Sequence, residues 1–430
     1  MNKLKMYLNI LICFVVILIV TTLIIPSIAS YATAEPPQIN SEGATLMDAT
    51  TGQILYSKNG DTNYFPASIT KVLTALVVLE NTKLDDKVTV GEKPPFADGT
   101  SVGIKTGEIF TVHQLLLGLL LESGNDCAEA LAEHVSGSCE EFAKLMTERA
   151  KKLGTKSSTF KNPSGLPDPE HVTTSNDYSL IMKEIIKNPD FLDIDKTTNL
   201  QLPTSNLGEQ RIFNNRNYIL LKNSNYYYPF SIASKKGYTI DAKFTNVISA
   251  TKDGRTLIVT SLKGEDINKS YEDATNLLNY GFDNFTKVTL YSQGDIVDSI
   301  SLSDGTSLPL LASKDIYYTV KTGDQDTLDK SVDYEAPTDL DNKSLTRGEI
   351  LTKGKVILNG EEIQDIELAS GISRDSNAKM TLASFFENYT TIIVLLGGGI
   401  VILFVIKTIN RRKRIRERIR RSRINQILNK

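Results

Sequence analysis

Cysteine and histidine are scarce in this sequence, and their scarcity limits the chemistry that it can carry. Three of each occur among 430 residues. Cys13 lies in an apolar leader, so Cys127 and Cys139 form at most one pair in the body of the chain, and a disulfide framework is excluded. We interpret both as small, packed hydrophobic residues. No histidine stands at metal-ligand spacing, so the sequence predicts neither a metal site nor a cofactor.

Charge is distributed unevenly along the chain. With 40% hydrophobic and 23% charged residues, the composition allows two ordinary domains and fits neither a disordered protein nor a polytopic membrane protein. The formal charge is −3, yet residues 407–430 contain eleven Lys or Arg and one acid, which gives +10. Residues 1–34 carry +2, so residues 35–406 carry −15. This acidic body argues against nucleic-acid binding, and we expect no nucleic-acid partner.

The first 34 residues have the pattern of a secretory signal. Lys3 and Lys5 precede an apolar run from Leu8 to Ile25, and the small residues at 32–34 resemble a signal-peptidase site. The apolar run is long for a signal. Residues 1–34 are therefore interpreted as a signal peptide or, alternatively, as an uncleaved N-terminal anchor.

A second apolar segment lies near the C-terminus. Residues 388–406 contain no charge and nearly span a hydrocarbon core of about 30 Å, so we predict a transmembrane helix there. Arg411–Arg414 follows, which predicts a cytoplasmic tail at residues 407–430 and a body on the extracytoplasmic face of the cell membrane. The tail is interpreted as a stop-transfer anchor, with binding to anionic lipid or a cytoplasmic partner as the alternative.

Between these segments the chain divides in two. Residues 35–285 mix helical and strand patterns, with a strong hairpin signal at Asp253-Gly254, and predict an α+β domain with an antiparallel sheet. Residues 286–370 alternate short β-rich runs with turns and predict a small all-β domain. We interpret this domain as a spacer that lifts the body from the membrane, with partner recruitment as the other possibility. Residues 371–387 are predicted to link it to the membrane helix.

The first candidate catalytic pair is Ser68 and Lys71. Both lie at the start of a predicted buried helix, one turn apart on the same face. A serine hydroxyl needs a base, and a lysine serves as one when its pKa falls from about 10.4 towards 7, a shift of about 4.6 kcal/mol. Burial, the helix N-terminus and a second cation all act in that direction. Three other Ser-x-x-Lys spacings do not open a buried helix: Ser158–Lys161, Ser249–Lys252 and Ser376–Lys379.

Two further motifs follow along the chain. Ser123-Gly124-Asn125 comes after an apolar helix and can present a hydroxyl and an amide, although alone it is also typical of a helix N-cap. The segment Ser234–Thr239 precedes the predicted hairpin. Ser-x-x-Lys, Ser-x-Asn and Lys-Thr-Gly, in this order, characterise penicillin-interacting serine enzymes. Literal Lys-Thr-Gly occurs at residues 105–107, in a turn, and at residues 321–323, in the predicted β domain. We interpret neither as the third motif and assign that motif to Ser234–Thr239.

With these motifs, the chain resembles the low-molecular-weight penicillin-binding proteins, which are serine D-alanyl-D-alanine carboxypeptidases. The segments that carry the resemblance run through most of the body: Pro66–Leu76, Leu119–Asp126, Phe160–Asp168, Glu335–Pro337 and Lys353–Gly360. The resemblance implies an α+β penicillin-binding/β-lactamase-like transpeptidase domain, followed by the small all-β domain. Many relatives end in an amphipathic helix lying on the membrane, where this chain has its predicted span.

The resemblance also implies a role for each motif. Ser68 attacks the penultimate D-Ala carbonyl of a peptidoglycan stem peptide, and Lys71 accepts its proton. Ser123 and Asn125 relay protons and hold the substrate amide. The substrate-binding residues are then Lys235, Lys236, Gly237 and Tyr238. Lys235 adds positive charge, and the backbone N–H groups of Ser68 and Tyr238 form the oxyanion hole. Water releases the acyl-enzyme, and β-lactam antibiotics are expected to act as covalent inhibitors.

The third motif departs from the family's pattern at its middle residue. The family has Thr or Ser where this chain has Lys236, and that hydroxyl binds the substrate's terminal carboxylate. A lysine contacts a carboxylate as a point charge, with less directional preference. The leading hypothesis is an active D-Ala-D-Ala carboxypeptidase, and the alternative is a weakly active or non-catalytic peptidoglycan-binding homologue. A β-lactamase is disfavoured, because Gly124 stands where those enzymes usually have Asp and because the β domain and anchor are extra.

Overall fold

The computed structural model describes residues 35–376 and 397–414, together with Tyr7, Tyr389, Val394 and Arg416. Two compact units are present: Met1–Val288 with Tyr317–Thr327, and Thr289–Ile316 with Leu328–Lys430. Within the described residues, no helix is both long enough and apolar enough to cross a membrane. Apart from Tyr7, the predicted signal lies outside the described residues, as do parts of the predicted linker, span and tail.

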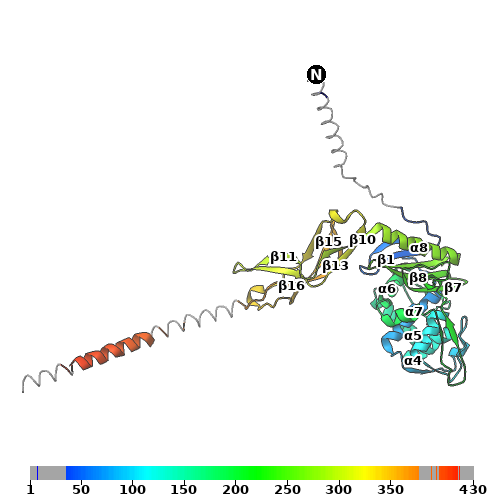
Figure 1. Ribbon diagram of the computed structural model, residues 1–430, viewed down its shortest axis with the longest axis horizontal. Coiled ribbons are helices and arrows are strands. Elements are labelled where there is room, and N and C mark those ends of the chain that lie inside the picture. The colour runs from blue at the N-terminus through cyan, green and yellow to red at the C-terminus, as the bar shows by residue number, and fades with distance from the viewer. Residues whose placement is uncertain are drawn as a thin grey trace, which may run out of the picture. The chain divides into compact units, whose positions relative to one another are not determined.

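A five-stranded antiparallel sheet, of order β2-β1-β9-β8-β7, forms the centre of the first unit (Figure 1). The bounds of its strands are β1 Gly43–Asp48, β2 Ile54–Lys58, β7 Ser231–Thr239, β8 Lys243–Lys252 and β9 Arg255–Gly264. The predicted hairpin at Asp253-Gly254 is confirmed: it joins β8 to β9, and both residues have the positive φ that a type I′ turn requires. Strand β7 lies at an edge, and no further strand in the described part of the chain pairs with its outer side.

Helices cover both faces of this sheet. In Figure 1, α8 (Ile267–Asn284) lies on one face and α4 to α7 on the other. The smaller core, beneath α8, joins side chains such as Leu277 to Leu257 of the sheet. The larger core joins Met47 and Ile258 to the remaining helices. Their bounds are α2 Thr70–Asn81, α3 Val112–Leu117, α4 Asn125–Ser136, α5 Cys139–Lys152, α6 Ser175–Ile185 and α7 Pro189–Lys196.

Shorter elements connect the helices. The two-stranded pairs are β3 Lys87–Thr89 with β4 Ile109–Thr111, β5 Asn199–Gln201 with β6 Ile212–Asn214, and β10 Phe285–Tyr291 with β13 Ile316–Lys321. A π-helical turn, Gly118–Glu122, follows α3 directly. Short 3₁₀ turns cover Ala67–Ile69, Pro94–Phe96, Tyr218–Leu220, Gln325–Thr327 and Leu340–Asn342. Cys127 is buried and Cys139 is half-buried, and both thiols are free.

The segment around Lys321-Thr322-Gly323 belongs to the first unit, whereas the sequence placed it in the β domain. Long-range hydrogen bonds explain the difference. The side chain of Gln53 accepts from the backbone N–H of Thr319 at 2.6 Å and donates to its carbonyl at 3.1 Å. The Thr319 hydroxyl also donates to the buried carboxylate of Asp48 at 3.0 Å. The start of the β-rich sequence texture therefore does not coincide with a clean boundary between the units.

The second unit contains a five-stranded antiparallel sheet of order β11-β12-β16-β15-β14. Its strands are β11 Ile296–Ser301, β12 Ser307–Ala312, β14 Lys330–Tyr334, β15 Ile350–Leu358 and β16 Glu361–Ser370. Leu302, Leu308, Leu340 and Leu345 form a small buried cluster on it. The predicted all-β character of this region is thus confirmed. Residues 397–414 are helical.

The packing of α8 on the sheet depends on Gly281. A Cβ at this position would lie 2.7 Å from Leu257 Cδ1 and 2.8 Å from Leu46 Cδ2. We expect Gly281→Val to lower the free energy of unfolding by about 1–3 kcal/mol through overpacking. Asn276→Val, at an exposed position of the same helix, is the control for helix propensity. Denaturant unfolding measures both, and equal effects of the two variants would contradict this account.

Candidate active site

Ser68 lies in the 3₁₀ turn Ala67–Ile69 that leads into α2. Ala67 has φ +49°, an uncommon value for a residue with a side chain. The Thr245 hydroxyl of β8 donates to the carbonyl of Pro66 at 2.8 Å and fixes the turn to the sheet. A Cβ on Gly237 would lie 2.6 Å from the backbone nitrogen of Ser68. Only glycine therefore allows strand β7 to approach the Ser68 amide this closely.

Lys71 lies behind Ser68 and has no exposed surface. Its Nζ donates to Ser68 Oγ at 3.0 Å and to the Ser164 carbonyl at 2.7 Å. Burial first, and then the charge of Lys235, hold the pKa of Lys71 well below its ordinary value. Asn162 Oδ1 accepts N–H groups from the loop that follows it, including that of Ser164, and so fixes this carbonyl. The arrangement places an amine whose charged form is disfavoured by burial within hydrogen-bond distance of the Ser68 hydroxyl.

Ser123 follows the π-helical turn and has a left-handed backbone, with φ 65° and ψ 33°. Its Oγ accepts a hydrogen bond from Lys235 Nζ at 3.1 Å. The N-cap interpretation is wrong, because Gly124 occupies the N-cap of α4 and no side chain bonds there. A non-glycine residue in this conformation costs of order 1–3 kcal/mol and is typical of functional sites. The strained backbone aims the hydroxyl at Lys235.

Asn125 begins α4 and is only 4% exposed. Its Nδ2 donates to the Asp98 carbonyl at 2.5 Å, whereas its Oδ1 is buried without a hydrogen-bond partner. A buried polar atom without a partner is costly. The carbonyl oxygen of this amide is therefore the group that remains available to accept a hydrogen bond.

The two lysines of the third motif have different surroundings. Lys235 is buried, and this burial lowers its pKa; Lys236 and Arg216 act in the same direction, while Asp195 opposes them. Asp195 of α7 is itself buried, which raises the pKa of its carboxyl, and it accepts the Ser234 N–H at 2.7 Å. Asp195 thus ties α7 to β7 beneath the motif.

A cleft of ≈ 510 Å³ lies over these residues, a volume typical of small-molecule sites. Of the residues predicted from sequence, six line it: Ser68, Ser123, Lys235, Lys236, Gly237 and Tyr238. Lys71 and Asn125 do not line it, although Lys71 bonds directly to Ser68. Tyrosine and phenylalanine side chains supply its apolar wall. The structure therefore brings all three motifs together at one cleft.

Positive charge dominates one wall of the cleft. Lys236 Nζ lies 4.1 Å from the ring centroid of Tyr218, a cation–π contact. Arg216 Nε pairs with Glu122 Oε2 at 2.6 Å, and Glu122 Oε1 also accepts the Asn214 N–H. Among the described residues, no carboxylate forms an ion pair with Lys236. Since the one acidic side chain here is already paired, the wall suits an anionic substrate group.

Sequence reasoning missed several members of this site. Ser164 lies in a segment that resembled the family's loop, but only its backbone carbonyl acts, which residue identity does not reveal. Arg216, Asp195 and Thr245 come from segments with no motif and reach the site through tertiary packing. Within the described residues, no cluster of acidic, His or Cys side chains could hold a metal ion.

The competing motifs are not at the cleft. Ser158 donates to the carboxylate of Asp177 at 2.8 Å, and Ser249 is buried in β8. Residues 105–107 form a turn beside Glu108, as predicted. None of these residues, nor residues 321–323, lines the cleft.

His171 supports the nucleophile turn from behind. It is 1% exposed; its Nδ1 accepts the Lys161 N–H at 3.3 Å, and its Nε2 lies 3.1 Å from the hydroxyl of Thr70, next to Lys71. Burial lowers the pKa of His171 from 6.5 to about 4. Nδ1 accepts a hydrogen bond from the Lys161 N–H and therefore carries no proton itself. The neutral ring, with its proton on Nε2, fits this contact and the contact with Thr70.

The lowered pKa of His171 predicts acid lability. Between about pH 6.5 and 4 the unfolded chain binds a proton at this ring that the folded chain does not, so stability falls as the pH drops through that window. We expect a loss of up to about 3 kcal/mol relative to a His171→Gln variant. Unfolding free energies of both proteins, measured from pH 7 to 4, should converge by this amount; parallel curves would contradict it.

Comparison with known proteins places this geometry in a family. Residues 30–265 match the family described as D-alanyl-D-alanine carboxypeptidase, and residues 285–374 match the penicillin-binding protein 5 C-terminal domain. D-alanyl-D-alanine carboxypeptidase DacF of Bacillus subtilis is 30% identical over 66% of this chain and 73% of its own. DacA of Haemophilus influenzae is 31% identical over 77% of this chain and 85% of its own.

Solved structures agree with these relatives. Penicillin-binding protein 5 from Haemophilus influenzae has a TM-score of 0.67 at 27% identity, and the match covers 80% of this chain and 100% of that one. A D-alanyl-D-alanine carboxypeptidase from Mycobacterium tuberculosis has a TM-score of 0.54 at 30% identity, over 59% of this chain and 95% of that one. The resemblance predicted from the three motifs is thereby confirmed, and the chain belongs to the D-alanyl-D-alanine carboxypeptidase family of serine peptidases.

Proposed function

We propose a specific course for the carboxypeptidase reaction on this chain. Ser68 Oγ attacks the carbonyl of the penultimate D-Ala in a peptidoglycan stem peptide, and its proton passes to Lys71 Nζ. The carbonyl–nitrogen bond breaks, and the nitrogen of the terminal D-Ala leaves with a proton delivered through Ser123. Water then attacks the ester on Ser68, which releases the shortened peptide and restores the serine. The observation that carries this proposal is the 3.0 Å contact between the buried, weakly basic Lys71 and Ser68.

The oxyanion of each tetrahedral intermediate is assigned to the backbone N–H groups of Ser68 and Tyr238. Support comes from Gly237, whose lack of a side chain brings β7 against the Ser68 nitrogen. Because β7 is an edge strand, no strand within the residues that the structure describes covers its outer side. Removal of a single oxyanion-hole donor from a serine peptidase costs about 2.7–4 kcal/mol of transition-state stabilisation. Asn125, with Oδ1 unpartnered, is assigned to the substrate amide N–H.

The same nucleophile accounts for reaction with β-lactams. Ser68 would open the strained lactam ring as it opens the peptide bond. The leaving nitrogen, however, stays attached to the acyl group, and so it continues to obstruct the approach of water. A lasting adduct on Ser68 is the expected outcome, in contrast to the rapid turnover of a β-lactamase.

We assign the protein to the cell membrane, with its catalytic unit on the extracytoplasmic face. The support is sequence pattern alone: the signal-like residues 1–34, the uncharged segment 388–406 and the basic residues after it. The unit with the second sheet is then a spacer between the catalytic unit and the membrane segment. Peptidoglycan is found on that side of the membrane, so the assignment agrees with the substrate.

The weakly active alternative is not favoured. It was motivated only by Lys236, and that side chain lines the same cleft as the nucleophile. Lys71 bonds to Ser68, Lys235 bonds to Ser123, and both serines line the same cleft. The relatives that match most of the chain are named as carboxypeptidases.

Removal of the nucleophile tests the reaction. We expect Ser68→Ala to lower D-Ala release from a D-Ala-D-Ala peptide by about 10⁴-fold or more and to abolish labelling by penicillin. Ser249→Ala is a matched control, because Ser249 also has lysine three residues on, and its buried hydroxyl has no hydrogen-bond partner. No D-Ala release by the wild type, or labelling that survives in Ser68→Ala, would refute the proposal.

Lys236 is assigned to the terminal carboxylate of the substrate. Its unpaired charge beside Arg216 is the supporting observation. We expect Lys236→Ala to raise KM for the peptide about tenfold with little change in kcat, and Lys236→Thr to restore part of the loss through a hydroxyl. Lys222→Ala removes an equal charge at an exposed position outside the cleft lining and is the control. An unchanged KM in Lys236→Ala would show that the carboxylate is held elsewhere.

A further inference from the structure

Asn125 is oriented by the loop that precedes it in sequence. The Asp98 carbonyl accepts from Asn125 Nδ2 at 2.5 Å, and the Thr100 carbonyl accepts from its backbone N–H at 2.6 Å. Both nitrogens of the residue are therefore held by residues 98–100. The amide cannot turn over without losing the Asp98 contact, so this loop decides that Oδ1 is the atom left to accept a substrate hydrogen bond.

The next residues of the loop, 101–104, are held through hydrogen bonds that they donate to Asp126. The carboxylate of Asp126, which follows Asn125, accepts the Ser101 hydroxyl at 2.6 Å and the N–H groups of Val102 at 3.0 Å and Gly103 at 2.9 Å. It also accepts the Ile104 N–H at 3.2 Å. Asp126 thus gathers the hydrogen-bond donors of the loop around the start of α4.

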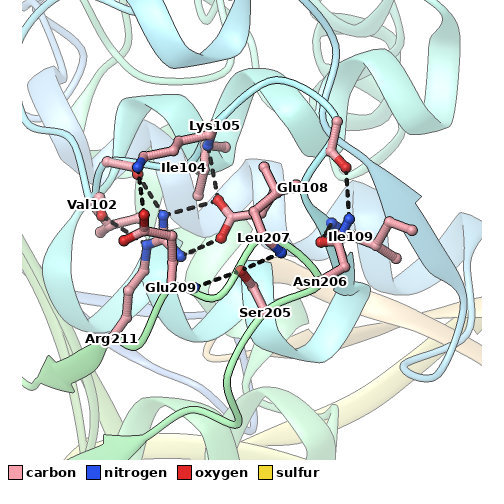
Figure 2. A network of polar contacts seen from close by, with 12 residues as sticks. Val102, Ile104, Lys105, Glu108, Ile109, Ser205, Asn206, Leu207, Glu209 and Arg211 are labelled. Atoms are coloured by element: carbon pink, nitrogen blue, oxygen red, sulfur yellow. Dashed lines mark hydrogen bonds and ion pairs between the residues drawn. The ribbon is translucent and has the colours of Figure 1, made fainter.

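The carbonyl groups of the same loop are held by Arg211 (Figure 2). Its Nε donates to the Val102 carbonyl at 3.2 Å, and its Nη2 donates to the Gly103 carbonyl at 2.5 Å. Its remaining donor capacity is directed to Glu108, at 2.6 Å from Nη1 and 2.9 Å from Nη2. A guanidinium can make all these bonds at once, whereas an ammonium has neither the planar fork nor the number of donors.

Glu108 makes this anchor a buried one. Its side chain is 0% exposed, and Oε2 also accepts the Lys105 N–H at 2.9 Å. Despite burial, the hydrogen bonds from Arg211 and Ser205 lower the pKa of the Glu108 carboxyl, so the pair remains ionic. A second ion pair, Lys105 with Glu209, also joins the loop before Glu108 to the segment that contains Arg211, and this pair is exposed. Exposed pairs contribute little, so the buried pair is the effective tie.

We propose that Arg211, held by Glu108, is a positioning residue for Asn125 in acylation of Ser68. Arg211 does not line the cleft and acts through the loop: it fixes the carbonyls of Val102 and Gly103, and the loop fixes both nitrogens of Asn125. The proposal rests on the carboxypeptidase reaction described above and adds to it the group that sets the amide's orientation.

A double-mutant cycle between Arg211 and Asn125 tests this link. The second-order rate constant for acylation by labelled penicillin would be measured for wild type, Arg211→Lys, Asn125→Ala and the double variant. Arg211→Lys should lower the constant about tenfold in the wild-type background and by less than about twofold in the Asn125→Ala background. Glu108→Gln, which keeps the shape of the side chain, should behave in the same way as Arg211→Lys.

Arg149→Lys provides the matched control. Arg149 also makes a forked ion pair, with Glu80 at 2.7 to 2.9 Å, but it joins α5 to α2 away from the cleft lining. Its acylation constant should match that of the wild type even where thermal unfolding shows a similar loss of stability. An equal fall from Arg211→Lys in both Asn125 backgrounds, or no fall in either, would overturn the proposal. A wild type that neither releases D-Ala nor reacts with penicillin would instead refute the proposed function.

Discussion

A lysine amine enclosed away from water is the constraint on which the rest of this active site depends. Lys71 has no exposed surface, and its Nζ bonds to the Ser68 hydroxyl and the Ser164 carbonyl. An ammonium in that place loses its hydration, so the uncharged form is favoured and retains a lone pair for the serine proton. The apolar residues that follow on α2 provide the enclosure, and the loop from Asn162 provides the carbonyl. The helix, the loop and the turn that carries Ser68 therefore all favour the uncharged form of Lys71.

The two lysines of the third motif differ in the direction in which their side chains point. Successive side chains of a strand point to opposite faces, so Lys235 and Lys236 of β7 have separate surroundings although they are neighbours. The amine of Lys235 donates a hydrogen bond to Ser123, with the buried Asp195 nearby. The positive charge of Lys235 also lowers the pKa of Lys71. Lys236 lies over Tyr218 in the open cleft. The departure from the family's third motif thus adds a cation to the cleft lining, and this cation also helps to lower the pKa of Lys235.

Much of the fold could be predicted from sequence where the determining signal is local. The hairpin at Asp253-Gly254 depends on two adjacent residues that tolerate positive φ, and the buried helix after Lys71 depends on an unbroken apolar run. The contacts of Arg216 and Asp195 could not be predicted, because each depends on how a distant segment packs. The N-cap interpretation of Ser123 failed for a related reason: the preceding π-helical turn sets its backbone conformation, and the tripeptide does not record that turn.

The approach of β7 to Ser68 has a consequence for how this enzyme can change. Because Gly237 lies against the Ser68 nitrogen, neither an added side chain there nor a slip of the strand by one residue is compatible with the present nucleophile turn. Residue 236, one position earlier, meets no such restriction and faces the cleft. Under the proposed assignment of Lys236 to the substrate's terminal carboxylate, substrate preference and the Gly237–Ser68 contact depend on adjacent positions of one strand. Single substitutions at residue 236 would then alter the preferred C-terminal residue of the substrate and leave the close approach of Gly237 to Ser68 in place.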